Sequence, residues 1–270
     1  MAVRMTTAIS LRGVSKTYRP PRKPPYTAIT GFDLDVDAGR FVAVVGPSGC
    51  GKSTLLSLVS GLLPASTGTI TLNGTAVSEV RTDVGFIFQR DALLPWKTVR
   101  ENVLLPFDFR GVARPAATRT ADEWIARVGL ARFGDNYPHE LSGGMRKRAQ
   151  LAQSLAIDPG VLLMDEPFSA LDVQTRNLME NELLNLWGAA GKTVLFITHD
   201  LEEAIALSDE IVVMTAGPGR IKARYRVDLP RPRNVTEIRF APEFSALYER
   251  AWEDLRDEVT RSYEQSLQVS

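Results

Sequence analysis

The sequence has little of several residue types that define particular classes of protein. Among its 270 residues there is one cysteine, Cys50, so no disulfide can form within the chain and a reducing compartment suits it. Histidine occurs only twice, and neither histidine has metal-ligand spacing around it. Basic and acidic residues balance at 32 each, so the bulk charge does not favour binding to nucleic acid or to an anionic membrane.

Long hydrophobic runs are absent as well. The N-terminal stretch MAVRMTTAISLRGV lacks the apolar segment of about 7–15 residues that marks a signal peptide. No window approaches the roughly 18 uninterrupted apolar residues of a membrane span. We therefore expect a cytoplasmic protein that reaches a membrane only through a partner. The apolar content of 44% is that of an ordinary globular protein, and the length allows one large α/β domain.

The first part of the chain predicts short strands that lead into a glycine-rich loop. Residues 32–36 alternate between apolar and acidic side chains, as in a half-buried strand. Residues 41–45 are continuously apolar, which is typical of a strand buried on both faces of a parallel sheet. A helix is predicted over residues 53–59, directly after the loop. The proline-rich residues 20–25 predict a stiff extended connection.

Strands and helices continue to alternate farther along. Asn73-Gly74 after a short apolar run predicts a hairpin turn, and residues 84–88 predict another strand. Residues 92–157 are helical in character, and buried strands are predicted over 161–164 and 193–197. The helix between these two strands is expected to bury Leu178, Leu183, Leu186 and Trp187. Strands alternating with helices imply a parallel sheet, interrupted here by a helical insertion.

The last forty residues predict an appendage to this domain. A proline-broken stretch at residues 228–234 precedes apolar side chains that recur at helical spacing: Phe244, Leu247, Ala251, Trp252, Leu255 and Val259.

The run Gly46-Pro47-Ser48-Gly49-Cys50-Gly51-Lys52-Ser53 predicts a phosphate-binding loop. Its glycines allow the backbone to turn tightly enough to point several N–H groups at one anion, and the following helix adds its positive end. Lys52 would reach the β- and γ-phosphates of a nucleotide, and the Ser53 hydroxyl would bind Mg²⁺. A plain glycine turn is the alternative, but the strand–loop–helix context favours phosphate binding.

Polar residues end the neighbouring predicted strands. Asp165 closes a buried strand, where an unpaired carboxylate is costly, so we expect it to hold Mg²⁺ through water. Glu166 follows on the opposite side and is suited to orient or deprotonate an attacking water; alone, the pair would be as compatible with an exposed strand end. Gln89 could touch both Mg²⁺ and water. His199 closes a further strand, where a lone histidine is more often structural than catalytic.

A second glycine-rich turn, Leu141-Ser142-Gly143-Gly144-Met145, opens a helical segment. With this turn, the motifs from about Ile9 to Arg226 resemble the nucleotide-binding subunit of an ABC transporter, in order and spacing. The resemblance rests on the phosphate loop, Gln89, Leu141 to Met145, Val161 to Glu166, Ser169-Ala170-Leu171-Asp172 and His199. It implies an α/β fold: a RecA-like P-loop NTPase core with a mainly parallel sheet, an N-terminal antiparallel β subdomain and an inserted α-helical subdomain.

The resemblance also implies how the site is completed. In that family the signature turn of one subunit closes over ATP held by the phosphate loop of the other, so Ser142, Gly143 and Gly144 would contact the partner's γ-phosphate. Asp172 would cross the interface, His199 would contact the γ-phosphate, and Tyr18 would stack on adenine, although a core or hairpin role suits Tyr18 equally. The implied ATP-binding residues are Tyr18, Gly46, Pro47, Ser48, Gly49, Cys50, Gly51, Lys52, Ser53, Thr54, Gln89, Ser142, Gly143, Gly144 and Asp172. The implied catalytic residues are Glu166, His199 and Lys52, and the implied Mg²⁺ ligands are Ser53, Gln89 and Asp165.

Softer signals narrow the resemblance to the nitrate/sulfonate/taurine importer group. They are Leu93-Leu94-Pro95-Trp96, Met145 and Leu229-Pro230-Arg231-Pro232-Arg233. Two positions depart from many relatives: Met145 replaces a common Gln, and Gln153 replaces a common Arg, which puts the salt bridge of that Arg in doubt. We expect a nucleotide-binding domain over residues 1–227, with its helical subdomain at about 92–157, and a C-terminal helical extension over 228–270.

The expected function is ATP hydrolysis that drives import of a small solute through a separate membrane permease. The expected partners are a second nucleotide-binding subunit, permease subunits that meet the cluster around Trp96, and an extracytoplasmic solute-binding protein, but no nucleic acid. Trp96 and its neighbours could equally be core of the helical subdomain. The expected location is the cytoplasmic face of the inner membrane, by attachment to the permease. The alternatives are the ATPase of an exporter or lipid transporter and a soluble ABC ATPase without a transport role.

Overall fold

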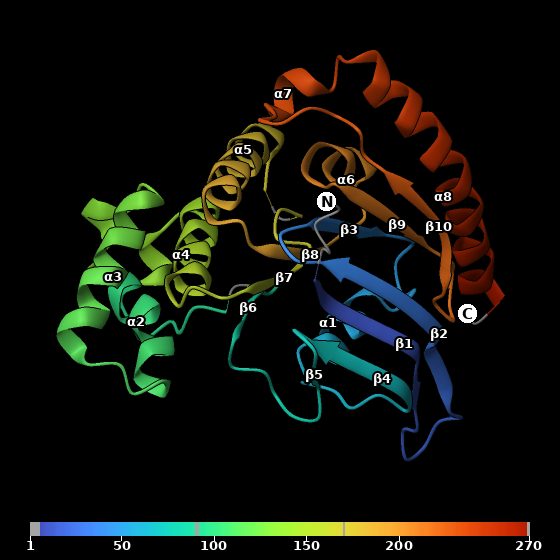
Figure 1. Ribbon diagram of the computed structural model, residues 1–270, viewed down its shortest axis with the longest axis horizontal. Helices are drawn as coiled ribbons and strands as arrows, with labels where there is room; N and C mark the ends of the chain where they lie inside the picture. The colour runs from blue at the N-terminus through green and yellow to red at the C-terminus, as the bar shows by residue number, and fades with distance from the viewer. Residues whose placement is uncertain (1–5, 90–91, 170, 269–270) are drawn as a thin grey trace.

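Two β-sheets and a separate group of helices make up the fold (Figure 1). The computed structural model describes residues 6–89, 92–169 and 171–268. Ala170, one residue of the run that carries the resemblance, lies outside these ranges. None of the helices in the described ranges combines the length and the apolar character needed to cross a membrane.

The N-terminal sheet is antiparallel, with strand order β2-β1-β4-β5. Its strands are β1 (Thr7–Tyr18), β2 (Tyr26–Asp37), β4 (Thr67–Leu72) and β5 (Thr75–Ala76). On β2 the apolar side chains of Phe32, Leu34 and Val36 are buried while their acidic neighbours are not, so the predicted alternation is confirmed. Asn73 and Gly74 both have positive φ, as a tight hairpin turn between β4 and β5 requires.

The second sheet has the order β10-β9-β3-β8-β7-β6, parallel except for the edge strand β10. Its strands are β3 (Phe41–Val45), β6 (Val84–Ile87), β7 (Val161–Asp165), β8 (Thr193–Thr198), β9 (Glu210–Met214) and β10 (Ile221–Arg226). Every residue of β3 and β8 is buried, because helices or the other sheet cover both faces. The carboxyl ends of β3, β7 and β8 therefore meet at one edge, where the predicted site residues follow.

Helices cover both faces of the parallel sheet. α1 (Lys52–Val59) lies between the two sheets, and its leucines share a core with β1, β2 and β3. The opposite face is covered by α5 (Val173–Ala190), α6 (Leu201–Leu207), α7 (Val235–Ile238) and the long α8 (Pro242–Gln268). Figure 1 shows α8 running along the edge beyond β10, at the far side from the helical group.

The helical group is inserted between β6 and β7 and has a core of its own. It consists of α2 (Val99–Phe109), α3 (Arg114–Arg127) and α4 (Gly143–Ala156), with short 3₁₀ turns at Ala131–Phe133 and Pro138–Glu140. The predicted helical character of residues 92–157 holds from Val99 onward, whereas residues 93–98 form an irregular loop. The expected fold class is confirmed: a P-loop NTPase core with an antiparallel β subdomain and a helical insertion.

Two details of the predicted burial are wrong. Leu178 is 71% exposed, because the buried face of α5 is set by Met179 and Leu183, and Leu178 lies about one position off that face. Leu186 and Trp187 are only partly buried. On α8, the apolar spacing continues beyond the core: Phe244, Leu247, Ala251 and Leu255 are buried, but Trp252 and Val259 are 39% and 43% exposed.

Candidate active site

The phosphate loop folds as a tight turn between β3 and α1. Gly51 caps α1 with φ of 103°, and a Cβ there would lie 2.8 Å from the carbonyl oxygen of Ala28. Gly49 has φ of 78°, also in the left-handed region. These two positions need glycine, because side chains rarely adopt this backbone and Gly51 has no room for one. The helix N-terminus and the loop amides together form an anion-binding end.

A cavity of about 330 Å³ opens over this loop. It is lined by Tyr18, Tyr26, Ala28, Ser48, Gly49, Gly51, Lys52, Ser53, Thr54, Gln89 and Glu166. The ammonium group of Lys52 donates to the carbonyl oxygens of Gly46 at 2.8 Å and Pro47 at 3.0 Å. The side chain is thus folded over the loop and buried, where a phosphate oxygen would replace these carbonyls as its partner.

Asp165 does not itself line this cavity, but it contacts Ser53, which does. The Ser53 hydroxyl donates to Asp165 Oδ1 at 3.1 Å, so the ends of β7 and the start of α1 are in contact. Burial raises the pKa of Asp165, and the hydrogen bond from Ser53 offsets this only in part. The ionised carboxylate therefore lacks compensation, which a cation would supply.

The donors present fit a magnesium ion that arrives with a nucleotide. The described residues contain no group of three or more His, Cys, Asp or Glu side chains that could hold a metal by themselves. Mg²⁺ is usually bound by one or two carboxylates with substrate phosphates and waters, and not by an all-protein cage. A hydroxyl and a desolvated carboxylate beside a phosphate cavity match that pattern.

Glu166 is the centre of a small hydrogen-bonded cluster at the edge of the cavity. Its Oε2 accepts a hydrogen bond from Gln89 Nε2 at 3.1 Å and lies 3.0 Å from His199 Nδ1. Its backbone has φ of 43°, a left-handed conformation that costs a non-glycine residue about 1–3 kcal/mol. Hydrogen bonds from Glu166 N to Ile197 and from Ser169 to the Glu166 carbonyl hold this geometry.

Three strand ends thus converge on Glu166. Gln89 follows β6, Glu166 follows β7 and His199 follows β8, and these strands are neighbours in the sheet. The sequence predicts each residue separately at a strand end; the structure adds that their side chains touch. An acidic oxygen held between an amide and an imidazole is suited to orient a water molecule.

The position of Tyr18 is compatible with both of the roles that the sequence leaves open. It ends β1 opposite Tyr26, and the two rings stack with centroids 5.1 Å apart across the hairpin. Both rings also line the cavity, and the Tyr18 hydroxyl lies 3.3 Å from the hydroxyl of Thr54. The pair offers an aromatic surface beside the phosphate loop.

The signature turn lies apart from this cavity. Ser142 caps α4 through a hydrogen bond from Met145 N to its hydroxyl at 3.3 Å, and it is exposed with Gly143. Asp172 caps α5 in the same way, accepting from Thr175 N at 3.0 Å, which lowers the pKa of its carboxyl. None of the described residues that line the cavity comes from the signature turn, and Asp172 is not among them.

Lys147 and Asn102 hold backbone segments around Gln89 and before α2, and the sequence analysis did not identify either residue. The buried ammonium of Lys147 donates to the carbonyl oxygens of Phe88 at 3.1 Å and Gln89 at 2.8 Å. It therefore ties the helix after the signature turn to the Gln89 backbone. Lys147 stands in a basic run, which usually means a solvated face, so the sequence gives no signal for it. Asn102 is fully buried and holds the loop before α2 through Leu94, Lys97 and Thr98.

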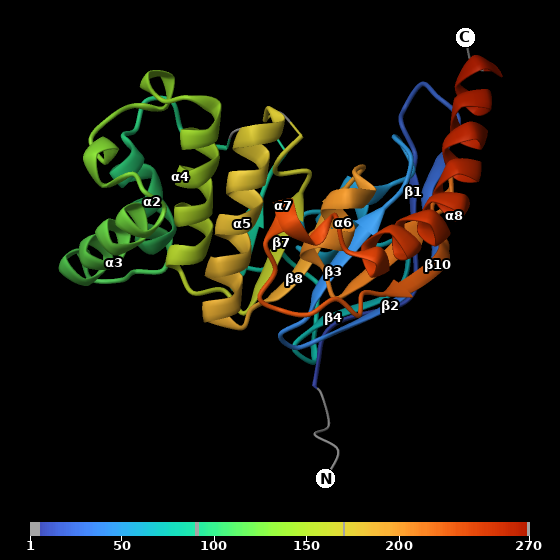
Figure 2. The same cartoon turned by 90° about the horizontal axis from the view of Figure 1, so that it is seen from above.

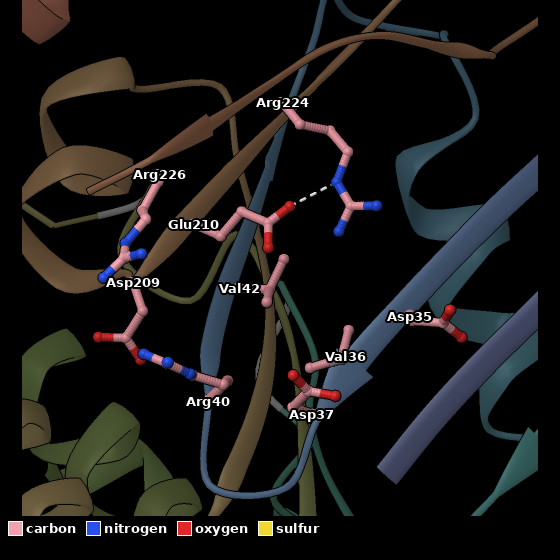
Figure 3. Close-up of a pocket in the computed structure, with 9 residues that line it drawn as sticks. All are labelled: Asp35, Val36, Asp37, Arg40, Val42, Asp209, Glu210, Arg224 and Arg226. Carbon is pink, nitrogen blue, oxygen red and sulfur yellow. Dashed lines mark hydrogen bonds and ion pairs between the residues drawn. The ribbon is translucent and has the colours of Figure 1, made fainter. Parts of the chain in front are cut away.

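Another cleft is lined by charged residues but gathers none of the predicted site residues (Figure 3). It lies where β2 approaches β9 and β10, and its charged members are Asp35, Asp37, Arg40, Asp209, Glu210, Arg224 and Arg226. Several of these charges are paired, as in Glu210 with Arg224 and Asp209 with Arg231. Asp35 pairs with Arg12 at 2.7 Å, and the hydrogen bond from Arg12 lowers the pKa of the Asp35 carboxyl. We interpret this cleft as a structural network of ion pairs.

Fold and site together define a P-loop ATPase: a phosphate loop follows the buried parallel strand β3, and carboxylates at the end of β7, in the same sheet, lie beside it. The chain belongs to the ABC transporter family, whose sequence model matches residues 29–169. It is an ATPase of the ABC type, as its similarity to ATP-binding cassettes shows.

Characterised and uncharacterised relatives match most of the chain. An uncharacterized ABC transporter ATP-binding protein of Methanocaldococcus jannaschii is 45% identical, over 87% of this chain and 86% of that protein. A taurine import ATP-binding protein of Rhizobium johnstonii is 44% identical, over 85% of this chain and 91% of that protein. A nitrate import ATP-binding protein of Synechococcus elongatus is 39% identical over 97% of this chain, which spans 39% of that longer protein.

A solved structure gives a similar result. The dimeric post-hydrolysis state of the ATP-binding cassette MJ0796, bound to ADP and Pi, superposes with a TM-score of 0.73 at 29% identity. The match covers 82% of this chain and all of that chain.

The similarity to the taurine and nitrate import proteins confirms the resemblance to the nitrate and taurine importer group at the level of sequence.

Proposed function

We propose that the chain is the ATP-hydrolysing subunit of an importer for a small solute, acting as a pair of copies that share two ATP molecules. The observation that carries this proposal is the separation of the two glycine-rich turns. The phosphate loop lines an open cavity, while the exposed Ser142–Gly144 turn caps α4 outside it. A second copy related by two-fold symmetry would place its turn over this cavity, and the dimeric state of the similar cassette supports that arrangement.

ATP binding in this proposal depends on the loop amides and two side chains. Lys52 leaves the carbonyls of Gly46 and Pro47 for the β- and γ-phosphates. Ser53 and Asp165, which are hydrogen-bonded to each other, would hold Mg²⁺ together with Gln89. When bound, Mg²⁺ neutralises phosphate charge. Tyr18 and Tyr26 offer a stacking surface for adenine, and the partner's Ser142 and the amides of Gly143 and Gly144 cover the γ-phosphate.

Hydrolysis then depends on positioning and charge neutralisation. Glu166 accepts a hydrogen bond from the attacking water and takes its proton as the water oxygen bonds to the γ-phosphorus and the bond to the β-phosphate oxygen breaks. Gln89 and His199 hold the carboxylate in place, since both contact its Oε2. Lys52 and the partner's signature amides stabilise the charge that develops on the phosphoryl oxygens.

Coupling to transport is proposed through the helical group. Of the residues expected either to form core or to meet the permease, Leu93 belongs to the core of that group, whereas Trp96 is 69% exposed and free to meet a partner protein. Phe109, at the end of α2, is 83% exposed as well. These exposed apolar side chains could pack against a permease subunit. Lys147, in the same helical group, donates a hydrogen bond to the Gln89 carbonyl and so links that surface to the ATP site. Attachment would hold the protein at the cytoplasmic face of the membrane.

The solute is proposed to be of the sulfonate, taurine or nitrate class, with delivery by an extracytoplasmic binding protein. The support is the importer names of the similar proteins. The division of the chain into a nucleotide-binding part over residues 1–227, with a helical part at about 92–157, and an extension over 228–270 also remains a proposal. Purification of the tagged chain from detergent-solubilised membranes tests the coupling: a permease should accompany it, and its absence would contradict the importer role.

The substitution Glu166→Gln tests the proposed chemistry. The amide keeps the size of the side chain but cannot take a proton, so we expect turnover to fall by about 10²–10³-fold while ATP–Mg²⁺ binding remains. Because the nucleotide is then not consumed, the variant should form a stable ATP-dependent dimer in sedimentation experiments. Glu123→Gln, on the exposed surface of α3, is the matched control. Near-normal turnover of Glu166→Gln would contradict the role of Glu166.

A further inference from the structure

A second cavity, of about 420 Å³, opens on the other side of the phosphate loop. One wall is formed by Pro47, Ser48 and His199, and the other by α8 from Trp252 onward, with Trp252, Val259 and Tyr263. The Ser262 hydroxyl donates to the carbonyl oxygen of Ser48 at 3.4 Å, so α8 contacts the phosphate loop directly. We call this cavity the α8 groove. It is lined by the same loop that binds ATP but shares little of the ATP cavity.

The side of α8 that forms the groove carries apolar surface exposed to solvent. Its first half is anchored in the core by Phe244, Leu247 and Ala251. Farther along, Val259 and Tyr263, which both line the groove, are 43% and 65% exposed. Figure 2 shows the last turns of α8 extending past the rest of the chain on the side where α4 and α5 begin. Apolar surface of this kind, beside a functional loop, is typical of an interaction site.

Complementary apolar side chains lie at the start of α5. Val173, directly after Asp172, is 63% exposed, and Leu178, five residues farther along the helix, is 71% exposed. This part of α5 belongs to the same surface as the signature turn, since a Cβ on Gly144 would lie 2.9 Å from Thr175 Cγ2. Because the signature turn and the start of α5 are in contact, any dimer that places the partner's signature turn over the phosphate loop also brings the start of the partner's α5 close to it.

We propose that α8 is part of the ATP-dependent dimer interface and that the α8 groove receives the exposed apolar side chains at the start of the partner's α5. The inference rests on the proposed function, in which the partner's signature turn covers the phosphate loop. In that arrangement the partner's Val173, the residue after Asp172, would lie near Ser48, where the α8 groove opens. The C-terminal helix then helps to close the ATP site, and contact with Ser48 makes the groove sensitive to the conformation of the loop.

The test is carried out in the Glu166→Gln background, where the ATP-bound dimer persists. Val259→Asp places a charge in the α8 groove that dimer closure would bury, so the dimer dissociation constant at saturating ATP–Mg²⁺ should rise by about tenfold or more in sedimentation velocity. Val80→Asp is the matched control, because Val80 is 55% exposed and lies outside the groove. Binding of ATP to the monomer should be unchanged in both variants.

A pair of opposite charges placed across the proposed interface distinguishes loss of this contact from a general loss of folding. Val173→Lys alone should also weaken the dimer, and combining it with Val259→Asp should restore most of the lost affinity, since each Asp then meets the partner's Lys. Unchanged dimerisation of the Val259→Asp variant, or single effects that add without any restoration, would overturn the inference and leave the proposed function intact. Failure of Glu166→Gln alone to form a dimer would instead remove the proposed function and this inference with it.

Discussion

At the scale of single residues, the site depends on contacts between strand ends that are far apart in sequence. Gln89, Glu166 and His199 come from three neighbouring strands, and each alone would be an ordinary polar side chain. Together they fix the position of one carboxylate oxygen. Asp165, one residue earlier, meets Ser53 and faces the phosphate loop. Two adjacent acids are thereby given different partners, and hence different proposed roles.

His199 provides the residue-scale prediction. If it orients Glu166 and contacts the γ-phosphate, His199→Ala should lower kcat by about 10²-fold with little change in KM, because ATP is held mainly by the phosphate loop. His199→Gln, whose amide can still donate to Glu166, should recover part of the activity. The only other histidine, His139, is exposed on a 3₁₀ turn, and His139→Ala serves as the control. Equal turnover of His199→Ala and His139→Ala, measured by phosphate release, would contradict this role.

The sequence predicts the places of Gln89, Glu166 and His199 at strand ends, because each residue follows an apolar run that is typical of a buried strand. Phe41–Val45 is predicted correctly for the same reason, since five apolar residues before a glycine loop have few alternatives. Leu178 is predicted wrongly, because the buried face of a helix depends on which neighbours it meets. Leu93 and Trp96 look alike in sequence, yet one is core and the other is exposed. Lys147 gives no signal at all, as its partners are backbone carbonyls.

At the scale of elements, α5, α6 and α7 enclose a cluster of charges beside the site. Glu180 on α5 is fully buried, and Arg239 lies 3.6 Å from it. Arg176 pairs with Asp200, the residue after His199, and also reaches Glu203 at 3.5 Å. Thr198 donates to Glu203 at 2.6 Å. The cluster thus connects the helix that begins at Asp172 with the end of β8 and with the C-terminal part of the chain.

Glu180 gives this cluster a predicted pH dependence. Burial, and then the charge of Glu203, raise the pKa of Glu180 to about 8 from its ordinary value of 4.5. Because the folded-state pKa is raised, the stability contributed by protonated Glu180 is full below about pH 4.5 and is lost as pH rises through about 8. Glu180→Gln, which stays neutral, should therefore flatten the dependence of Tm on pH between these values and give its largest relative gain near pH 8.

Thermal unfolding followed by circular dichroism across that pH range measures the effect. Glu249→Gln, at an exposed position of α8, is the matched control and should follow the unsubstituted protein. Parallel Tm–pH curves for the Glu180→Gln variant and the unsubstituted protein would show that Glu180 does not titrate in this window.

At the scale of the whole molecule, the two glycine-rich turns are the proposed halves of a composite ATP site. Figure 2 shows α4 and α5 beginning on the side toward which the end of α8 extends. The phosphate loop opens into a cavity, and the signature turn is exposed elsewhere on the chain. The charge balance of 32 basic and 32 acidic residues gives two copies no overall repulsion to overcome. A two-fold pair would bring each half together with its complement.

The most direct test of this composite site uses Ser142 in the Glu166→Gln background. Aspartate and asparagine both cap a helix as well as serine, so Ser142→Asp and Ser142→Asn should preserve α4 and differ mainly by one negative charge. If Ser142 faces the partner's γ-phosphate, the Asp variant should bind ATP–Mg²⁺ as a monomer and fail to dimerise, while the Asn variant still forms dimers in sedimentation velocity. Equal dimerisation of the Asp and Asn variants would contradict the account, because the signature turn would then not meet the partner's ATP.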